Sequence, residues 1–242
     1  MKKRGSQIAK VTGSRFMPPW LPETNRVQYA DVRRLSDPQV AAFRQWVDQG
    51  AMEGDPADLP PTPQWTEGWQ LGEPDLVIPM PEPFSVRAEG ADVWRNFVIP
   101  IPLASPKFVR VFEFRPGNAK VLHHARMLFD TTGRCRERDE EDPEPGVEGM
   151  MMGAAENPAG QWLGWMPGKQ PVMGSEEISW QLLPGSDLVL EMHMLPSGKP
   201  EQIQPSLGLH FSTRPPQAHP LHPPVRPEEV RHRARGEQPH HS

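Results

Sequence analysis

Proline is the residue that most constrains this fold. The chain holds 32 prolines among its 242 residues. Proline lacks a backbone N–H and its ring clashes with the preceding turn of a helix, so a chain this rich in proline is not dominated by helices. The length still allows a sizeable core, in one large domain or in two small ones.

Short alternating apolar runs separated by Pro and Gly occupy residues 68–213. They are DLVIPM, DVWRNFVIPIPL, KFVRVFEF, AKVLHHARMLF, EISWQLL, DLVLEMHML and SLGLHFS. Several short strands with turn signals and no helices between them are typical of an antiparallel β-sandwich or jelly roll. Strict alternation in KFVRVFEF predicts that Phe112 and Phe114 share one face and that Val109 and Val111 share the other.

Helical signals are confined to residues 1–58. Ser36, Asp37 and Pro38 supply an N-cap followed by a proline in the first turn, and Gly50 is a candidate for the C-cap. The apolar residues between them, VAAFRQWV, repeat at helical spacing. A second, shorter helix is expected over residues 3–11.

Three further segments complete the organisation. Residues 59–67 (LPPTPQWTE) form a Pro-rich linker, so the mainly β domain spans 68–213. Residues 136–158 are predicted to form an acidic loop that contains a methionine triplet. The Pro/Arg/His-rich tail, 214–242, has few large apolar residues and is expected to be disordered.

Composition excludes several partners and sites. The net charge is −5 with both signs mixed along the chain, which gives no footprint for nucleic acid. No apolar run is long enough to span a membrane, and the basic N-terminus is not followed by the apolar segment of a secretory signal. The single cysteine, Cys135, excludes an internal disulfide and a cysteine-based zinc cluster.

Two adjacent histidines, His123 and His124, interrupt the strand pattern of AKVLHHARMLFD. Neighbouring residues of a regular strand point to opposite faces, so one imidazole would be buried and the other exposed. The alternative is a metal site, because a local bulge would bring both imidazoles to one side. The strand would then be distorted at 123–124.

A third ligand for such a site should come from a neighbouring strand. His193 in DLVLEMHML is the candidate. His210 is expected to be exposed, or to contact the ligands without binding the metal itself. Three imidazoles suit copper and zinc alike. Met192 and Met194 flank His193 and are expected to pack in the core. The histidines of the tail are expected to be solvated: His219, His222, His232, His240 and His241.

The two histidine-bearing segments resemble a known family. VLHHARMLFD, followed later by LVLEMHMLPSGK, resembles the N-terminal domain of the type II copper, ascorbate-dependent monooxygenases, which include the peptidylglycine alpha-hydroxylating and dopamine beta-monooxygenases. The resemblance covers roughly residues 70–213 and implies antiparallel jelly-roll domains. It also implies that His123, His124 and His193 hold a copper ion that relays electrons.

The N-terminal zone carries a second resemblance. RFMPPWLPE followed by RRLSDPQVAAFRQWVDQGA is similar to the second half of a small c-type cytochrome, in which Met17 would be the axial haem ligand. The alternative for Met17 is an ordinary apolar contact in a proline-stiffened loop. Together the two resemblances match bacterial proteins in which a cytochrome c is fused to the copper monooxygenase module.

The chain departs from that architecture at both ends. It lacks the Cys-x-x-Cys-His that attaches haem c, and after Thr213 it lacks the His-x-His and the methionine of the family's second copper site. The resemblance therefore implies a truncated protein with vacant haem ligation. Its missing partner would be a redox protein or the C-terminal copper domain, and its location the periplasm or the cell exterior.

These expectations leave three functions open. The first is the copper-binding electron-relay module of a C–H-hydroxylating oxidoreductase. The second is a stand-alone copper-binding or electron-transfer protein, and the third a non-catalytic β-sandwich interaction domain. The carboxylates of 137–148 favour a solvated loop over an acid–base site, and there is no Gly-x-Ser-x-Gly. Trp162 and Trp165 could line a substrate groove or pack in the core.

Overall fold

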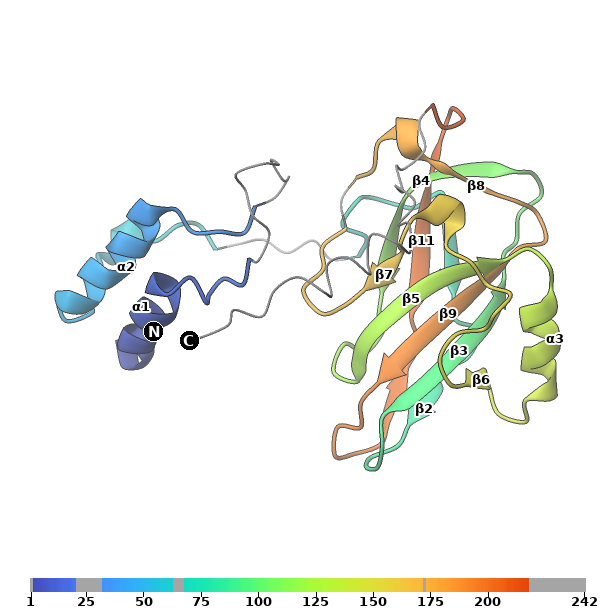
Figure 1. The fold of residues 1–242 in the computed structure, drawn as a ribbon, viewed down its shortest axis with the longest axis horizontal. Coiled ribbons are helices and arrows are strands. Elements are labelled where there is room, and N and C mark those ends of the chain that lie inside the picture. Colours follow the sequence, from blue (N-terminus) through green and yellow to red (C-terminus); the bar gives the residue numbers. More distant parts are fainter. Residues whose placement is uncertain (1, 21–31, 63–67, 172, 218–242) are drawn as a thin grey trace, which may run out of the picture. The chain divides into compact units, whose positions relative to one another are not determined.

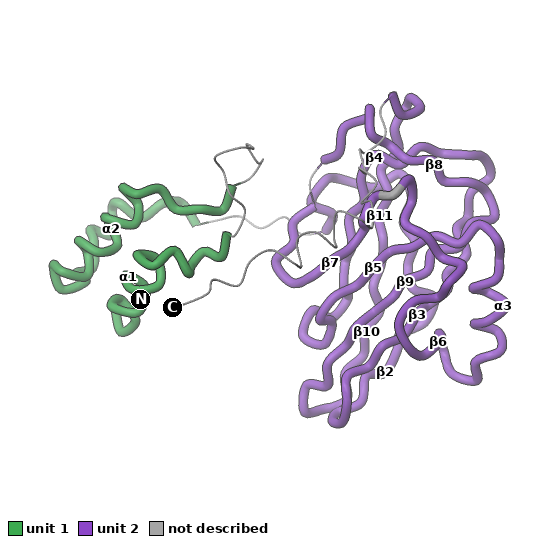
Figure 2. The backbone as a smooth tube through the Cα atoms, viewed as in Figure 1, with its two compact units in different colours: residues 1–64 green, residues 65–242 purple. Residues whose placement is uncertain are grey.

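The structure is a computed structural model of the whole chain. It describes residues 2–20, 32–62, 68–171 and 173–217. The chain divides into two compact units, residues 1–64 and 65–242 (Figure 2). The division falls inside the predicted linker, 59–67. The tail histidines, His219 to His241, lie outside the described residues.

The first unit is helical. Its elements are η1 (Lys2–Arg4), α1 (Gly5–Gly13), α2 (Asp37–Asp48) and η2 (Pro56–Asp58). The Ser36 side chain and Gln39 form a reciprocal capping box at the start of α2, and Gly50 follows the helix with φ +88°. Both predicted helices are therefore confirmed. No helix in the described part of the chain is long and apolar enough to cross a membrane.

Helix α1 packs against α2 through a small residue. A Cβ atom on Gly5 would lie 3.3 Å from Cγ2 of Val47, which is tighter than ordinary packing. Met17 follows α1, with its backbone N–H bonded to the carbonyl of Val11 at 3.0 Å and its side chain exposed. The similarity to a cytochrome c stays a prediction.

The second unit is mainly β and antiparallel, as expected. Its strands are β1 (Leu76–Pro79), β2 (Phe84–Val86), β3 (Val93–Pro100), β4 (Lys107–Arg115), β5 (Leu122–Asp130), β6 (Val147–Glu148), β7 (Gly164–Trp165), β8 (Trp180–Leu182), β9 (Asp187–Met194), β10 (Glu201–Ile203) and β11 (Ser206–Ser212). Its helices are α3 (Arg134–Glu141), η3 (Pro158–Gly160) and η4 (Glu176–Ile178).

The strands form two large sheets and one small one (Figure 1). The five-stranded sheet has the order β6-β3-β9-β5-β7, and the four-stranded sheet has the order β1-β11-β4-β8. Strands β10 and β2 pair separately. Strand β9 is central in its sheet, and all eight of its residues are buried. Such a strand has protein on both of its faces.

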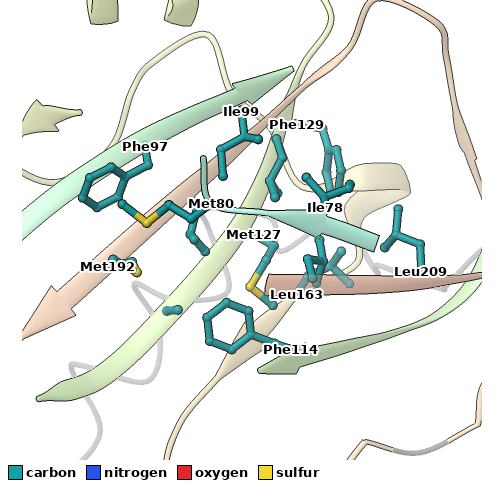
Figure 3. Packing of buried hydrophobic residues seen from close by; sticks show 14 of the residues in the cluster. Ile78, Met80, Phe97, Ile99, Phe114, Met127, Phe129, Leu163, Met192 and Leu209 are labelled. Atoms are coloured by element: carbon teal, nitrogen blue, oxygen red, sulfur yellow. The ribbon is translucent and has the colours of Figure 1, made fainter. Parts of the chain in front are cut away.

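One hydrophobic core draws residues from both large sheets (Figure 3). Ile78 and Leu209 come from the four-stranded sheet, and Met127 and Met192 come from the five-stranded sheet. Met192 and Met194 are fully buried, which confirms their expected place in the core. Alternate residues of β9 therefore face this core, and His193 between them faces the opposite, outer side of the sheet.

A second apolar cluster lies on that outer side. It contains Leu128, Cys135, Val147, Met152 and Val189. Leu128 and Val189 belong to the sheet, and the other members come from α3 and from the segment that begins at β6, so these two elements cover part of the outer face of the five-stranded sheet. Burial and the nearby carboxylate of Asp130 raise the pKa of the Cys135 thiol to about 12. The lone cysteine is therefore an inert packing residue.

Every run predicted as a strand contains one. The sequence patterns missed β2, β6, β7 and β10, which are two or three residues long and too short to show alternation. The acidic segment predicted as a loop is wrong in part, because α3 occupies its beginning. Charged residues at exposed helical positions gave no apolar periodicity to reveal this helix.

The predicted faces of KFVRVFEF are wrong in part: Phe112 and Phe114 both pack in the main core as expected, but Val109 and Val111 do not share the other face. Val109 and Phe114 both belong to the main core, although strict alternation separates them. The cause is a register shift against β11, where His210 pairs with Val111 and Phe211 pairs with Val109. Arg110 is the extra residue of this bulge. Residues before it therefore face the opposite side from the one that strict alternation, counted from the residues after it, predicts.

Candidate metal centre

The two adjacent histidines lie at a β-bulge. Leu122 pairs with Met194 and His124 pairs with His193, so β5 advances by two residues where β9 advances by one. His123 is therefore the additional residue, and strict alternation no longer sends it to the face opposite His124. The predicted distortion of the strand at 123–124 is confirmed.

Three strands place aromatic side chains in one row across the sheet. Trp94 of β3 pairs with His193 of β9, and His193 pairs with His124 of β5. Directly opposed residues on neighbouring strands present their side chains on the same face. Since His193 faces outward, the indole and both imidazoles meet on the outer side of the five-stranded sheet, and the bulge adds His123 to them.

The imidazole nitrogens converge closely enough to share one ion. Nδ1 of His123 lies 3.1 Å from Nδ1 of His124 and 3.1 Å from Nδ1 of His193. The possible ligand atoms of the three residues all lie within 4.8 Å of one another. Three imidazoles that bind a metal at their usual distance hold their nitrogens roughly 3 to 4 Å apart. The arrangement therefore fits a metal with little movement.

The three histidines form a set of possible metal ligands that recurs nowhere else in the described part of the chain. Among the residues that the structure describes, it is the one set of three or more His, Cys, Asp or Glu side chains arranged to hold an ion. All three ligand atoms are uncharged imidazole nitrogens, a donor set that suits copper and zinc and is poor for magnesium or calcium.

His193 is held by two neighbours that the sequence patterns did not identify. Its Nε2 lies 2.9 Å from Oδ2 of Asp92. A carboxylate only accepts, so Nε2 carries the proton and Nδ1 keeps its lone pair toward the other imidazoles. The indole of Trp94 stacks on the same ring, with centroids 3.9 Å apart and 10° between the planes. Neither contact has a sequence signal, because both depend on strand register.

His124 is in the neutral form, which is the form of imidazole that binds metals. Burial lowers the pKa of His124 below its ordinary value, and the neighbouring imidazoles of His193 and His123 lower it further. The ring is therefore neutral at neutral pH, with a free lone pair. The edge of the same ring meets Trp94, with centroids 5.2 Å apart. His123 is exposed, so the site opens to solvent on that side.

A paired charged row runs beside the histidines on the same face. Glu191 is buried and its Oε1 lies 3.3 Å from Nη1 of Arg126. Its other oxygen accepts the backbone N–H of Met151 at 3.0 Å. The guanidinium of Arg126 lies over the ring of Trp162, 4.2 Å from the centroid. Both oxygens of Glu191 are engaged in these contacts, so its carboxylate is not free to act as a metal ligand.

The two tryptophans proposed for a groove lie in different places. Trp162 is exposed above Arg126, whereas Trp165 packs against the main core. Trp165 lines a cavity of about 200 Å³ with Phe112 and Phe114, and Trp162 does not belong to that lining. Trp165 therefore packs against the core and also lines a cavity, whereas the exposed Trp162 does neither there.

His210 does not join the candidate centre. It belongs to β11 in the four-stranded sheet and is only 4% exposed, so the expectation that it is exposed is wrong. Its Nε2 is buried and has no hydrogen-bond partner among the described residues. The alternating pattern of β11 did not indicate the segments that cover this face of the sheet.

Comparison with known proteins adds no assignment. No protein-family model matches the chain, and no curated protein is significantly similar to it.

Proposed function

We propose that this chain is the copper-binding electron-relay module of a type II copper monooxygenase-like oxidoreductase. The observation that carries the proposal is the convergence of His123, His124 and His193 at a bulge, with their Nδ1 atoms 3.1 Å apart in two of the pairs. Three imidazoles also suit zinc. The choice of copper rests on the resemblance of the two histidine-bearing strands to that family.

The residues of this chain would bind and orient the metal. His123, His124 and His193 would be the ligands. Asp92 fixes the tautomer of His193, and Trp94 fixes the plane of the same ring. A bound copper supplies one-electron chemistry by alternating between Cu(I) and Cu(II). The exposed ring of His123 leaves the centre accessible to a redox partner.

The wider architecture is part of the same proposal. The two antiparallel sheets with a common core support a jelly-roll-like sandwich as the copper domain. The first unit would be the C-terminal half of a cytochrome c-like domain, with Met17 as a haem ligand only in a complete architecture that holds haem c. The second copper site would come from a partner domain, in the periplasm or outside the cell.

A stand-alone electron-transfer protein is the second candidate. The exposure of His123 favours it equally, because an accessible centre exchanges electrons with a partner whether or not hydroxylation follows. The genomic sequence on either side separates the two. An upstream Cys-x-x-Cys-His and a downstream His-x-His followed by a methionine support the monooxygenase module, and flanks without them support the carrier.

The copper assignment is tested on the full chain. Purified protein is reconstituted with Cu(II), and bound copper is counted before and after His123, His124 and His193 are each replaced by Ala. We expect one copper per wild-type chain and a large loss in each variant. Ascorbate should abolish the Cu(II) electron paramagnetic resonance signal of the wild type, and reoxidation should restore it.

Two results would overturn the proposal. Copper content unchanged in all three variants would disprove the site, and a bound copper that ascorbate cannot reduce would disprove the relay. Preferential retention of zinc from an equimolar mixture of Zn(II) and Cu(I) would show that the three histidines form a structural zinc site and not a copper site.

A further inference from the structure

The methionine triplet at 150–152 is divided between solvent and core. Met152 is buried in the second apolar cluster on the outer face of the five-stranded sheet. Met150 and Met151 are 59% and 62% exposed. Two adjacent long apolar side chains directed to solvent gain nothing from burial, so the fold itself does not account for them.

Hydrogen bonds hold this exposed pair beside the candidate metal centre. The backbone N–H of Gly149 donates to the carbonyl of Trp94 at 2.9 Å. The backbone N–H of Met151 donates to Oε2 of Glu191 at 3.0 Å. Trp94 stacks on His193, and Glu191 precedes His193 by two positions on the same face of β9. The pair is thus tethered at the Trp94 end of the row that carries the ligands and to the neighbouring row that contains Glu191.

The backbone at Met151 has an unusual conformation. Its φ is +63°, a left-handed value that non-glycine residues adopt at a cost of about 1 kcal/mol or more. Such a conformation persists only where the surroundings determine it, and here the bond to Glu191 and the burial of Met152 do so. The backbone that carries the two exposed thioethers is therefore held in place.

Thioether sulfur has a distinct metal preference. It is soft and uncharged, and it binds Cu(I) in preference to Cu(II) or Zn(II), whereas imidazole binds all three. We propose that Met150 and Met151 form a soft accessory site that captures Cu(I) beside His123, His124 and His193. This inference rests on the proposed function and deepens it, because it assigns the oxidation state in which copper enters.

The accessory site is tested by comparing metal ions on the full chain. A Met150→Leu/Met151→Leu variant keeps the size and apolarity of both side chains and has the same backbone preferences. The matched control is Met166→Leu/Met173→Leu, which alters two other exposed methionines. Each protein is titrated anaerobically with Cu(I) in the presence of ascorbate and a competing chelator, and separately with Cu(II) and with Zn(II).

We expect selective loss of Cu(I) affinity. The Cu(I) dissociation constant should rise about tenfold in the Met150/Met151 variant, the size of effect seen when a group that supports a metal site is removed. The constants for Cu(II) and Zn(II) should stay within about twofold of the wild type. X-ray absorption of the Cu(I)-loaded wild type should show a sulfur neighbour that the variant lacks and the control retains.

The outcomes separate this inference from the proposed function. Equal Cu(I) affinity in both methionine variants, without a sulfur neighbour in the wild type, overturns the accessory site and leaves the histidine centre standing. A wild type that binds neither Cu(I) nor Cu(II) overturns the proposed function. Parallel loss of Cu(I), Cu(II) and Zn(II) in the Met150/Met151 variant overturns the inference as well, because it shows a structural effect on the histidines.

Discussion

Two strands of the second unit are bulged, and each bulge lies at a histidine. In β5 the bulge adds His123 beside His124, and three imidazoles meet. In β4 the bulge adds Arg110 opposite β11, and His210 there is buried with its Nε2 unpartnered among the described residues. The same backbone irregularity thus yields a candidate ligand set in one sheet and an isolated imidazole in the other.

The difference lies in the opposing residue. His124 faces His193 across the ladder, whereas His210 faces Val111. Cross-strand neighbours on one face lie about 5 Å apart, which is close enough for two imidazoles to share an ion. A histidine within a strand therefore becomes a candidate ligand through its register partner, and neither its apolar context nor its burial decides the matter.

The largest expected effect is the difference in metal affinity between two variants, each of which removes the histidine on the strand that pairs with a bulged strand. His193→Ala should weaken copper binding by on the order of 100-fold or more, because it removes a ligand as well as its supports. His210→Ala should leave the affinity within about twofold. Competitive titration with a chromophoric chelator measures both. Similar losses in the two variants would mean that the contrast between the bulges has no functional meaning.

Sequence patterns predicted much of the fold because the longer strands are runs of apolar and β-favouring residues bounded by turn residues. The runs that became β3, β5, β9 and β11 all have this composition. Pairing order and bulges were not predictable, since alternation within one strand carries no information about its neighbours. Arg110 illustrates this limit, because this one additional residue places Val109 on the core face with Phe114, whereas strict alternation predicts opposite faces.

The candidate site was predictable only in part. The adjacent pair His123 and His124 is visible as a break in strand parity, and His193 as a polar residue inside an apolar strand. Asp92 and Trp94 carry no such sign. Asp92 is an acidic residue in a turn-like segment and Trp94 is an apolar residue at the start of a strand, and only register shows that both contact His193.

A smaller effect is expected from the carboxylate that orients His193. Asp92→Ala removes the acceptor of the Nε2 proton, so the ring can rotate or change tautomer, and copper affinity should fall about tenfold. The matched control is Asp75→Ala, because Oδ2 of Asp75 accepts the N–H of Phe211 at 2.6 Å beside the other bulge.

The control variant should lose stability in a thermal melt and keep its copper affinity. Asp92→Asn should recover less than half of the lost binding free energy, because its amide oxygen accepts without a charge. Full affinity in Asp92→Ala would show that the stacked indole alone fixes the imidazole of His193.

The stacked indole should contribute a few-fold to the same affinity. Trp94→Leu removes the aromatic face from His193 and the edge contact with His124, an interaction worth about 1 kcal/mol. Trp94→Phe should restore most of it. Bound Cu(II) quenches nearby indoles, so saturation with Cu(II) should reduce tryptophan fluorescence less in Trp94→Phe than in the wild type. Equal quenching would place the copper away from this row.

The smallest effect is expected at the isolated imidazole, where a change should stabilise the fold. His210→Leu replaces a buried ring whose Nε2 lacks a described partner with an apolar group of similar size. Removing an unsatisfied polar atom should raise the free energy of unfolding by about 1 kcal/mol, measured by urea denaturation of metal-free protein at pH 7. His193→Leu, under the same conditions, should not stabilise the fold, because it breaks the bond to Asp92 and the stack on Trp94. Destabilisation by His210→Leu would show that its Nε2 has a partner in solution, and the contrast between the two bulges would then rest on metal binding alone.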